Sequence, residues 1–159
     1  MPDIYRDNPN LKRANVQIEF TKKQVQEYQK CMEDPVYFTE TYVKIINLDE
    51  GLVPFKLYDF QRQMMWTFHT ERFTICKLPR QSGKSTTIIA YLLHYCLFNP
   101  TVSVAILANK AVVARDLLSR LQLAYEHLPD WLQQGVMTWN KGSLELENGS
   151  KILASSTSA

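Results

Sequence analysis

Four consecutive segments in the second half of the chain alternate between strand-like and helix-like patterns, which limits the fold more than any other feature. The runs 72–78 (RFTICKL) and 102–108 (VSVAILA) are short, apolar and rich in β-branched residues, as strands are. The runs 84–98 and 110–128 have the length and apolar spacing of helices. Strands joined by helices pair in parallel through right-handed crossovers. We therefore predict a three-layer α/β domain with a parallel sheet, in which 102–108 is a buried strand.

The end of the chain predicts a β-hairpin. Residues 143–154 (SLELENGSKILA) alternate in polarity on either side of Asn148-Gly149. Asn-Gly between two such runs is the strongest short-range signal for a hairpin turn. The hairpin is expected to follow the second helix of the α/β part.

The first third of the chain is polar at its start and then helical. Residues 1–20 show no periodicity, so we expect an extended or mobile arm. Thr21 and Asp34-Pro35 are typical helix starts, and 51–54 is expected to be a break before a third helix. The predicted inward positions are Val25, Tyr28 and Met32 in the first helix, Phe38, Tyr42 and Ile45 in the second, and Leu57, Phe60, Met64 and Phe68 in the third. The segment 21–56 is therefore predicted to be helical.

Composition is that of an ordinary globular protein, with 45% apolar and 21% charged residues. The net charge of +2 is too small to indicate nucleic-acid binding, so any DNA contact would need a local patch. No apolar run approaches the roughly 20 residues of a membrane span, and we expect a cytosolic protein. Cys31, Cys76 and Cys96 are far apart and are predicted to be core thiols in a reducing compartment.

The stretch 76–93 (CKLPRQSGKSTTIIAYLL) has the pattern of a phosphate-binding loop that runs into a helix. Such a loop needs inward backbone N–H groups, a lysine for the terminal phosphates and a hydroxyl for Mg²⁺. Gly83 lets the backbone approach the phosphates, and Lys84 supplies the charge. Ser85 is the candidate Mg²⁺ ligand, and Thr86 opens the helix. We therefore expect a nucleotide site here.

The loop departs from the usual pattern because Leu78 stands where its first glycine is normally found. The alternative is an ordinary helix start capped by Ser82. The position of the loop between a predicted strand and a predicted helix favours the nucleotide site.

Three other positions could belong to this site, and each has a plainer interpretation. Gln61 could present its carboxamide to the edge of adenine, or it could be a surface glutamine. Arg80 could reach the γ-phosphate in the transition state, or it could be a solvated loop arginine. Asn109-Lys110 could contact nucleic acid or sense the nucleotide, but we favour a role in capping the next helix.

Taken together, these motifs resemble a known family. The element Phe60-Gln61-Arg62 is followed by the loop 80–85 (RQSGKS) and then by 139–150 (WNKGSLELENGS). From about Leu52 to its last residue the chain resembles the N-terminal ATPase region of the large terminase subunit of tailed bacteriophages, most closely the myovirus type. A glycine-poor start of the loop is normal in that family.

The resemblance implies a P-loop NTPase fold of the additional-strand, helicase-like kind, with 57–159 as the first part of the ATPase domain. It implies a motor that uses ATP and Mg²⁺ to translocate double-stranded viral DNA into a procapsid. The expected partners are the portal protein, the small terminase subunit and further copies of the chain in a ring on the procapsid, in the host cytoplasm.

The resemblance also assigns roles to individual residues. Gln61 falls on the adenine-recognition glutamine, and Arg80 falls on the loop arginine proposed as a finger. Lys84 falls on the phosphate lysine, and Ser85 on the magnesium hydroxyl. The predicted nucleotide-binding set is Gln61, Arg80, Gln81, Ser82, Gly83, Lys84, Ser85 and Thr86, with Arg80 and Lys84 as the catalytic pair.

One part of an ATPase site is not found in the sequence. Hydrolysis needs an aliphatic strand that ends in Asp-Glu, and the run 143–148 (SLELEN) alternates instead. We therefore expect an incomplete ATPase domain without the nuclease domain of the family, which binds nucleotide weakly and does not turn it over alone. Two other functions stay open: a helicase-like ATPase of related fold, and a non-hydrolysing module whose helical first third binds a partner.

Overall fold

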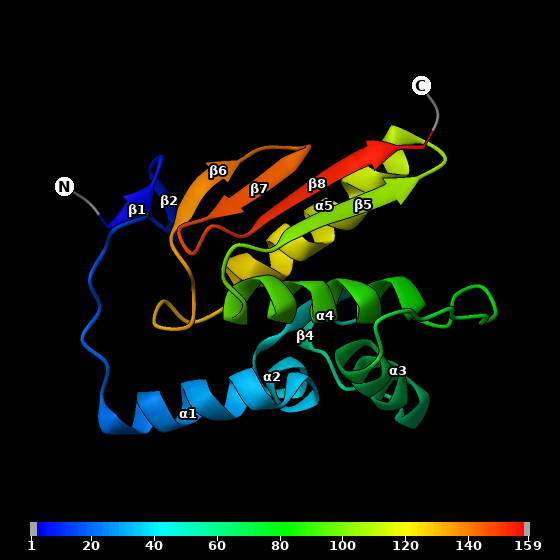
Figure 1. The fold of residues 1–159 in the computed structure, drawn as a ribbon, viewed down its shortest axis with the longest axis horizontal. Coiled ribbons are helices and arrows are strands. Elements are labelled where there is room, and N and C mark those ends of the chain that lie inside the picture. The colour runs from blue at the N-terminus through cyan, green and yellow to red at the C-terminus, as the bar shows by residue number, and fades with distance from the viewer. Residues whose placement is uncertain (1–2, 158–159) are drawn as a thin grey trace.

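The computed structural model describes residues 3–157, which form five helices and eight strands (Figure 1). The helices are α1 (Lys22–Glu33), α2 (Pro35–Tyr42), α3 (Asp59–Thr70), α4 (Lys84–Phe98) and α5 (Ala111–Glu126). The strands are β1 (Ile4–Tyr5), β2 (Asn8–Lys12), β3 (Lys44–Asn47), β4 (Gly51–Pro54), β5 (Ser103–Ala108), β6 (Val136–Trp139), β7 (Ser143–Leu146) and β8 (Lys151–Ser156). Within this range no helix has both the length and the apolar character that crossing a membrane requires.

The main sheet is mixed and has the strand order β5-β8-β7-β6. β5 and β8 are parallel, whereas β7 pairs antiparallel with both β8 and β6. The predicted hairpin is confirmed as β7 and β8. Its turn passes through Asn148 and Gly149, and Gly149 adopts the left-handed conformation with φ +84°. β6 was not predicted, because a pattern of only four residues does not distinguish a strand from a loop.

The segment 72–78 is not a strand, which corrects the prediction. It has no ladder partner among residues 3–157, and the side chains of Phe73 and Ile75 are 82% and 97% exposed. β5 is the terminal strand of the sheet, and its outer edge is unpaired within residues 3–157. A β-branched run becomes a strand only where a neighbouring strand satisfies its N–H and C=O groups. The predicted pairing of 72–78 with 102–108 is therefore absent, and β5 pairs with β8 instead.

Helices cover one face of the sheet among the described residues, whereas the predicted three-layer fold needs helices on both. α5 packs against β5 and β8, and α4 packs against α5 (Figure 1). On the opposite face the side chains of Leu107, Met137 and Leu153 are exposed. β5 is accordingly half-buried, with Ile106 in the core and Leu107 60% exposed, so the prediction of a buried strand is wrong.

The two long helices form where the apolar spacing predicts them. α4 spans Lys84–Phe98 as expected, and α5 covers most of the predicted run 110–128. Their buried side chains meet those of β7 and β8 in one core, which includes Leu93, Leu97, Leu118, Leu121, Tyr125, Leu144 and Ile152. Burial raises the pKa of the Cys31 and Cys96 thiols to about 12, as suits core cysteines. Cys76 is half-buried in the unpaired segment, so its predicted core position is wrong.

The helix starts of the first third are confirmed. Thr21 accepts a hydrogen bond from Gln24 N and caps α1, and Asp34 accepts one from Tyr37 N and caps α2. The break expected at 51–54 is instead β4, which pairs antiparallel with β3.

The predicted inward faces of this region are only partly correct. Val25, Met32 and Phe60 are exposed, and Ile45 lies in β3 instead of a helix. Cys31 is buried in place of its neighbour Met32. The α1 pattern is therefore correct in period but shifted by about one residue in phase.

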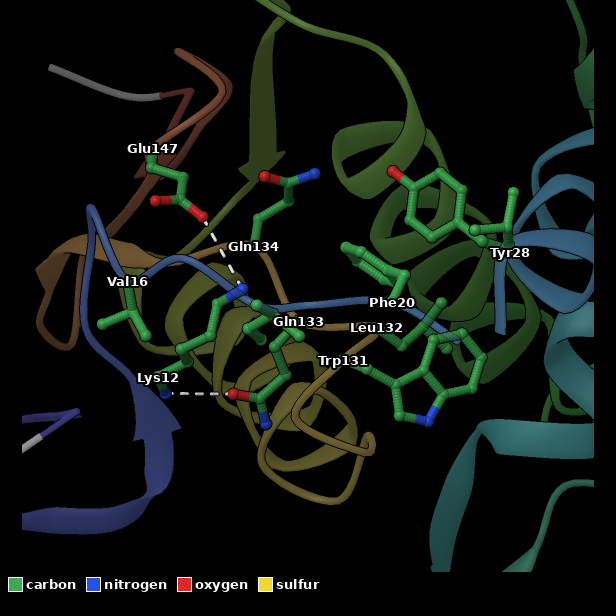
Figure 2. A pocket seen from close by; sticks show the side chains of 11 residues that line it. Lys12, Val16, Phe20, Tyr28, Trp131, Leu132, Gln133, Gln134 and Glu147 are labelled. Carbon is green, nitrogen blue, oxygen red and sulfur yellow. Dashed lines mark hydrogen bonds and ion pairs between the residues drawn. The ribbon is translucent and has the colours of Figure 1, made fainter. Parts of the chain in front are cut away.

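The expected mobile arm is tied to the domain. Lys12 N donates to Gln133 Oε1 at 3.0 Å, and Gln133 Nε2 donates back to the Asn10 carbonyl at 3.0 Å. Glu147 accepts from Asn15 N at 2.9 Å and pairs with Lys12 Nζ at 3.7 Å, as Figure 2 shows for the lysine. These contacts make residues 10–15 a strap along the start of β6.

Replacing Gly135 with alanine should release this strap. An added Cβ would lie 2.5 Å from Ala14 Cα and 2.7 Å from the Arg13 carbonyl oxygen, and backbone cannot yield as a flexible side chain does. We expect a loss of roughly 1–3 kcal/mol in the free energy of unfolding and faster proteolysis between 13 and 20. Gly142→Ala is the control, because its nearest neighbour, Asn140 Oδ1, is 3.8 Å away. Equal proteolysis of the two variants would contradict the strap.

His94 is buried in an aromatic cluster, with 1% of its surface exposed. The rings of Phe38, Tyr91 and Phe98 surround it. Nε2 lies 2.8 Å from the Cys31 carbonyl, whereas the buried Nδ1 has no partner within the described chain. Burial lowers the pKa of His94 to about 4, so the folded protein holds this ring neutral.

The free energy of unfolding should therefore fall as the pH falls from about 6.5 to about 4, the interval in which only the unfolded chain takes up this proton. The contribution is about 3 kcal/mol over the interval. His94→Leu cannot titrate, and its stability should change less between pH 7 and pH 4 in urea unfolding. The same change in both proteins would rule out His94 as the source.

Candidate functional site

A tight turn joins the unpaired segment to α4. Gln81 and Gly83 both have left-handed backbone conformations, with φ +59° and +74°, and Gly83 is the N-cap of α4. The first N–H groups of a helix have no partner within it, and the helix dipole adds positive potential there. Successive N–H groups in such a turn form a concave site for an anion. The predicted loop therefore places two left-handed residues directly before the N-terminus of a helix.

The side chains of the first turn of α4 are held close to this loop. Lys84 Nζ donates to the Pro79 carbonyl at 3.1 Å and lies 3.5 Å from that of Leu78. Thr87 Oγ1 donates to the Gly83 carbonyl at 2.9 Å and closes the helix start. Lys84 is thus folded over the loop, and its ammonium group contacts two carbonyl oxygens there.

The three small polar residues of the loop differ in their surroundings. Ser82 Oγ is buried and has no hydrogen-bond partner among residues 3–157. It does not accept from the start of α4, so the alternative role of Ser82 as a helix cap is not seen. Ser85 is half-buried in the first turn of α4, and Thr86 lines a hollow beside the loop.

Gln61 is buried behind the loop, with 2% of its surface exposed. Its Oε1 accepts from Tyr58 N at 2.9 Å, and its Nε2 lies 3.5 Å from the Ser82 carbonyl. A Cβ added at Gly83 would lie 2.6 Å from the same Nε2. The structure therefore brings Gln61 and the loop together, although 22 positions separate Gln61 from Gly83 in the sequence, and the surface-glutamine alternative is wrong.

The hollow beside the loop has a volume of about 610 Å³. It is lined by the β3–β4 hairpin, the approach to α3 and the loop, with Ile45, Asn47, Val53, Pro54, Phe55, Lys56, Tyr58, Phe60, Gln61, Leu78, Pro79, Gln81, Ser82, Gly83 and Thr86. Tyr58 and Phe60 stack with ring centroids 6.0 Å apart and an angle of 8° between their planes. The hollow thus joins aromatic and apolar walls to a turn rich in N–H donors.

The remaining predicted residues lie outside this lining. Arg80 is exposed on the turn, and Lys84 and Ser85 sit on the helix side of the loop. Asn109 and Lys110 are exposed between β5 and α5, and the Lys110 carbonyl accepts from Val113 N and Ala114 N. This backbone contact begins α5, as the favoured interpretation of these two residues expects.

Sequence reasoning missed Glu40, Tyr58 and the β3–β4 hairpin. Glu40 lies on α2 and contacts the chain just before α3, and Gln61 lies in the first turn of α3. Burial alone would raise the pKa of Glu40, but its hydrogen bonds with Arg62 and Leu57 N outweigh burial and hold that pKa below its ordinary value. No periodic pattern in the sequence marks these positions, because their roles depend on contacts between separate elements.

The fold is that of an α/β domain with a tight turn at the start of α4. The family model described as "Terminase large subunit, T4likevirus-type, N-terminal" matches residues 75–159, more than half of the chain. The chain belongs to this family, which links it to viral DNA packaging, and the resemblance inferred from sequence is confirmed. The loop lies inside the matched range, and Gln61 lies before it.

Proposed function

We propose that the chain is the ATP-binding part of a DNA-packaging motor and that residues 78–86 hold the triphosphate. One observation carries the assignment: the turn before α4 combines two left-handed residues with a buried, unpartnered Ser82 hydroxyl. A buried hydroxyl without a partner costs free energy, and a phosphate oxygen would satisfy it. Membership of the terminase large-subunit family supports ATP as the source of that phosphate.

Lys84 is the mobile cation of the site. It exchanges weak contacts with the Pro79 and Leu78 carbonyls for the terminal phosphates, which stabilise an ammonium group more strongly. The N–H groups of the turn hold the other phosphate oxygens. Arg80, exposed on the same turn, is the candidate to stabilise charge in the transition state.

Ser85 is the proposed Mg²⁺ ligand. Mg²⁺ keeps several waters and takes phosphate oxygens as ligands, so one protein hydroxyl in the first turn of α4 fits this ion. When bound, the ion would neutralise negative charge on the β- and γ-phosphates.

Gln61 and the hollow form the proposed base end of the site. The Gln61 amide already contacts Tyr58 N and the Ser82 carbonyl, and these contacts leave one N–H for a ligand. The aromatic wall of Tyr58 and Phe60 offers a flat apolar surface to a purine.

The proposed cycle converts ATP hydrolysis into translocation of double-stranded viral DNA. The proposed partners are the portal protein, the small terminase subunit and further copies of the chain, in a ring on the procapsid in the host cytoplasm. These partners follow from the family alone.

Nucleotide binding by this chain is the direct test. A fluorescent ATP analogue with Mg²⁺ should bind with a stoichiometry of about one, and ATP should displace it. In the intact subunit, double-stranded DNA should then stimulate hydrolysis without strand separation. Absence of binding in a folded chain would overturn the proposal, and unwinding of duplexes would favour a helicase instead.

A further inference from the structure

Glu40 joins α2 to the beginning of α3. Its Oε1 accepts from Leu57 N at 3.1 Å and from Arg62 Nη2 at 2.7 Å. The Arg62 guanidinium also donates to Asp59 Oδ1 at 2.8 Å. Glu40 Oε1 therefore binds both the backbone at Leu57, just before α3, and the side chain of Arg62, in the first turns of α3.

The Glu40 side of this contact is more protected than the Arg62 side, which is 42% exposed. The Glu40 side chain is 24% exposed, whereas Asp59, the other partner of Arg62, is fully exposed. Exposed pairs contribute little, but a hydrogen bond between a carboxylate and a backbone N–H at a fixed point of the chain is stronger. Leu57 itself is buried, so its N–H has a defined position.

The first turn of α3 in turn contacts the loop before α4. Gln61 lies between Leu57 and Arg62 in the sequence, so both of the Glu40 contacts bracket it. Its amide contacts the Ser82 carbonyl and lies 2.6 Å from where a Cβ added at Gly83 would stand. A continuous set of contacts therefore runs from α2 through α3 to the turn before α4.

We infer that Glu40 is a positioning residue of the nucleotide site, which sets the place of Gln61 and, through it, the shape of the turn 81–83. The expected effect of Glu40 on nucleotide binding rests on the proposed function. Its effect on the position of Gln61 and the turn does not depend on nucleotide. It assigns to the helical first third of the chain a role in the site.

The test compares Glu40→Ala and Glu40→Gln with Glu27→Gln. Glu27 is a matched control, because its Oε1 also accepts two hydrogen bonds between helices, from Tyr37 and Tyr42 at 2.5 and 2.9 Å. Glu27 ties α1 to α2 and has no contact with α3 in these bonds. NMR signals of the Gly83 amide and the Gln61 side-chain NH₂ report the turn directly in the free protein.

Glu40→Ala should shift both signals and weaken binding of the ATP analogue by roughly 10-fold, as loss of a charged hydrogen bond predicts. Glu40→Gln keeps an acceptor for Leu57 N and should give smaller effects in the same direction. Glu27→Gln should leave both signals and the affinity unchanged. If Glu40→Ala does not fold, Glu40→Gln and Arg62→Gln carry the test.

Unchanged Gly83 and Gln61 signals in a folded Glu40 variant would overturn the inference, as would equal shifts in Glu27→Gln. Failure of the wild-type chain to bind nucleotide would overturn the proposed function instead. In that case the NMR shifts still decide whether Glu40 positions the turn.

Discussion

Lys84→Ala should reduce DNA-stimulated ATP hydrolysis by the intact subunit by at least about 100-fold. Lys84 is the only lysine in the turn and first helical turn, residues 78–87, and its ammonium group already lies over the loop carbonyls. No other side chain there supplies a positive charge except the exposed Arg80. Release of inorganic phosphate measured with saturating duplex DNA gives the rate, and titration of the ATP analogue gives the affinity.

Lys77→Ala is the control for a general loss of positive charge. Lys77 is exposed in the unpaired segment and precedes the loop, so its removal changes the net charge equally without reaching the turn. Hydrolysis by Lys77→Ala should stay within a few-fold of wild type. Near-normal turnover in Lys84→Ala would exclude this loop as the phosphate site.

Gly83→Ala should destabilise the protein and abolish nucleotide binding. A residue with a Cβ at φ +74° pays roughly 1–2 kcal/mol in backbone strain. The added Cβ would also displace Gln61 Nε2, which breaks the contact with the Ser82 carbonyl at a further cost of about 1 kcal/mol. Urea unfolding measures the total, and the ATP analogue measures the loss of the site.

Gly51→Ala separates these two costs. Gly51 has φ +75°, almost the same as Gly83, but an added Cβ there would meet no atom within 4 Å. Its loss of stability should therefore equal the backbone strain alone, and nucleotide binding should persist. An equal loss of unfolding free energy in the two glycine variants would show that the Gln61 side chain does not restrict the turn.

Local sequence signals predicted the elements that depend on local contacts. The spacing of α4 and α5, the caps at Thr21 and Asp34, and the Asn148-Gly149 turn all lie within a few residues of the groups they satisfy. The same signals failed for 72–78, because a strand needs a partner that can lie anywhere in the sequence. They also failed for residues 10–15, whose partners Gln133 and Glu147 are more than 100 residues away.

In the candidate site, too, local sequence signals predicted the features that depend on local contacts and not those that depend on distant residues. The turn 81–83 and Lys84 belong to one short motif, in which the structure shows left-handed backbone at Gln81 and Gly83. The approach of Gln61 was expected from a resemblance, whereas Glu40 was not expected at all. Its role depends on where α2 lies against α3, and no spacing within either helix encodes that arrangement.

Within residues 3–157 the outer edge of β5 is unpaired, which has a consequence for handling the protein. Its sequence, SVAILA, contains no proline and no charge, and Leu107 and Leu153 lie exposed on the adjoining face. Natural sheets block such edges with lysine, proline or a bulge, because a bare edge is a template for strands of other molecules. Concentrated solutions of this chain should therefore aggregate through β5, and a charge placed at Ala105 would be the first change to make for solubility.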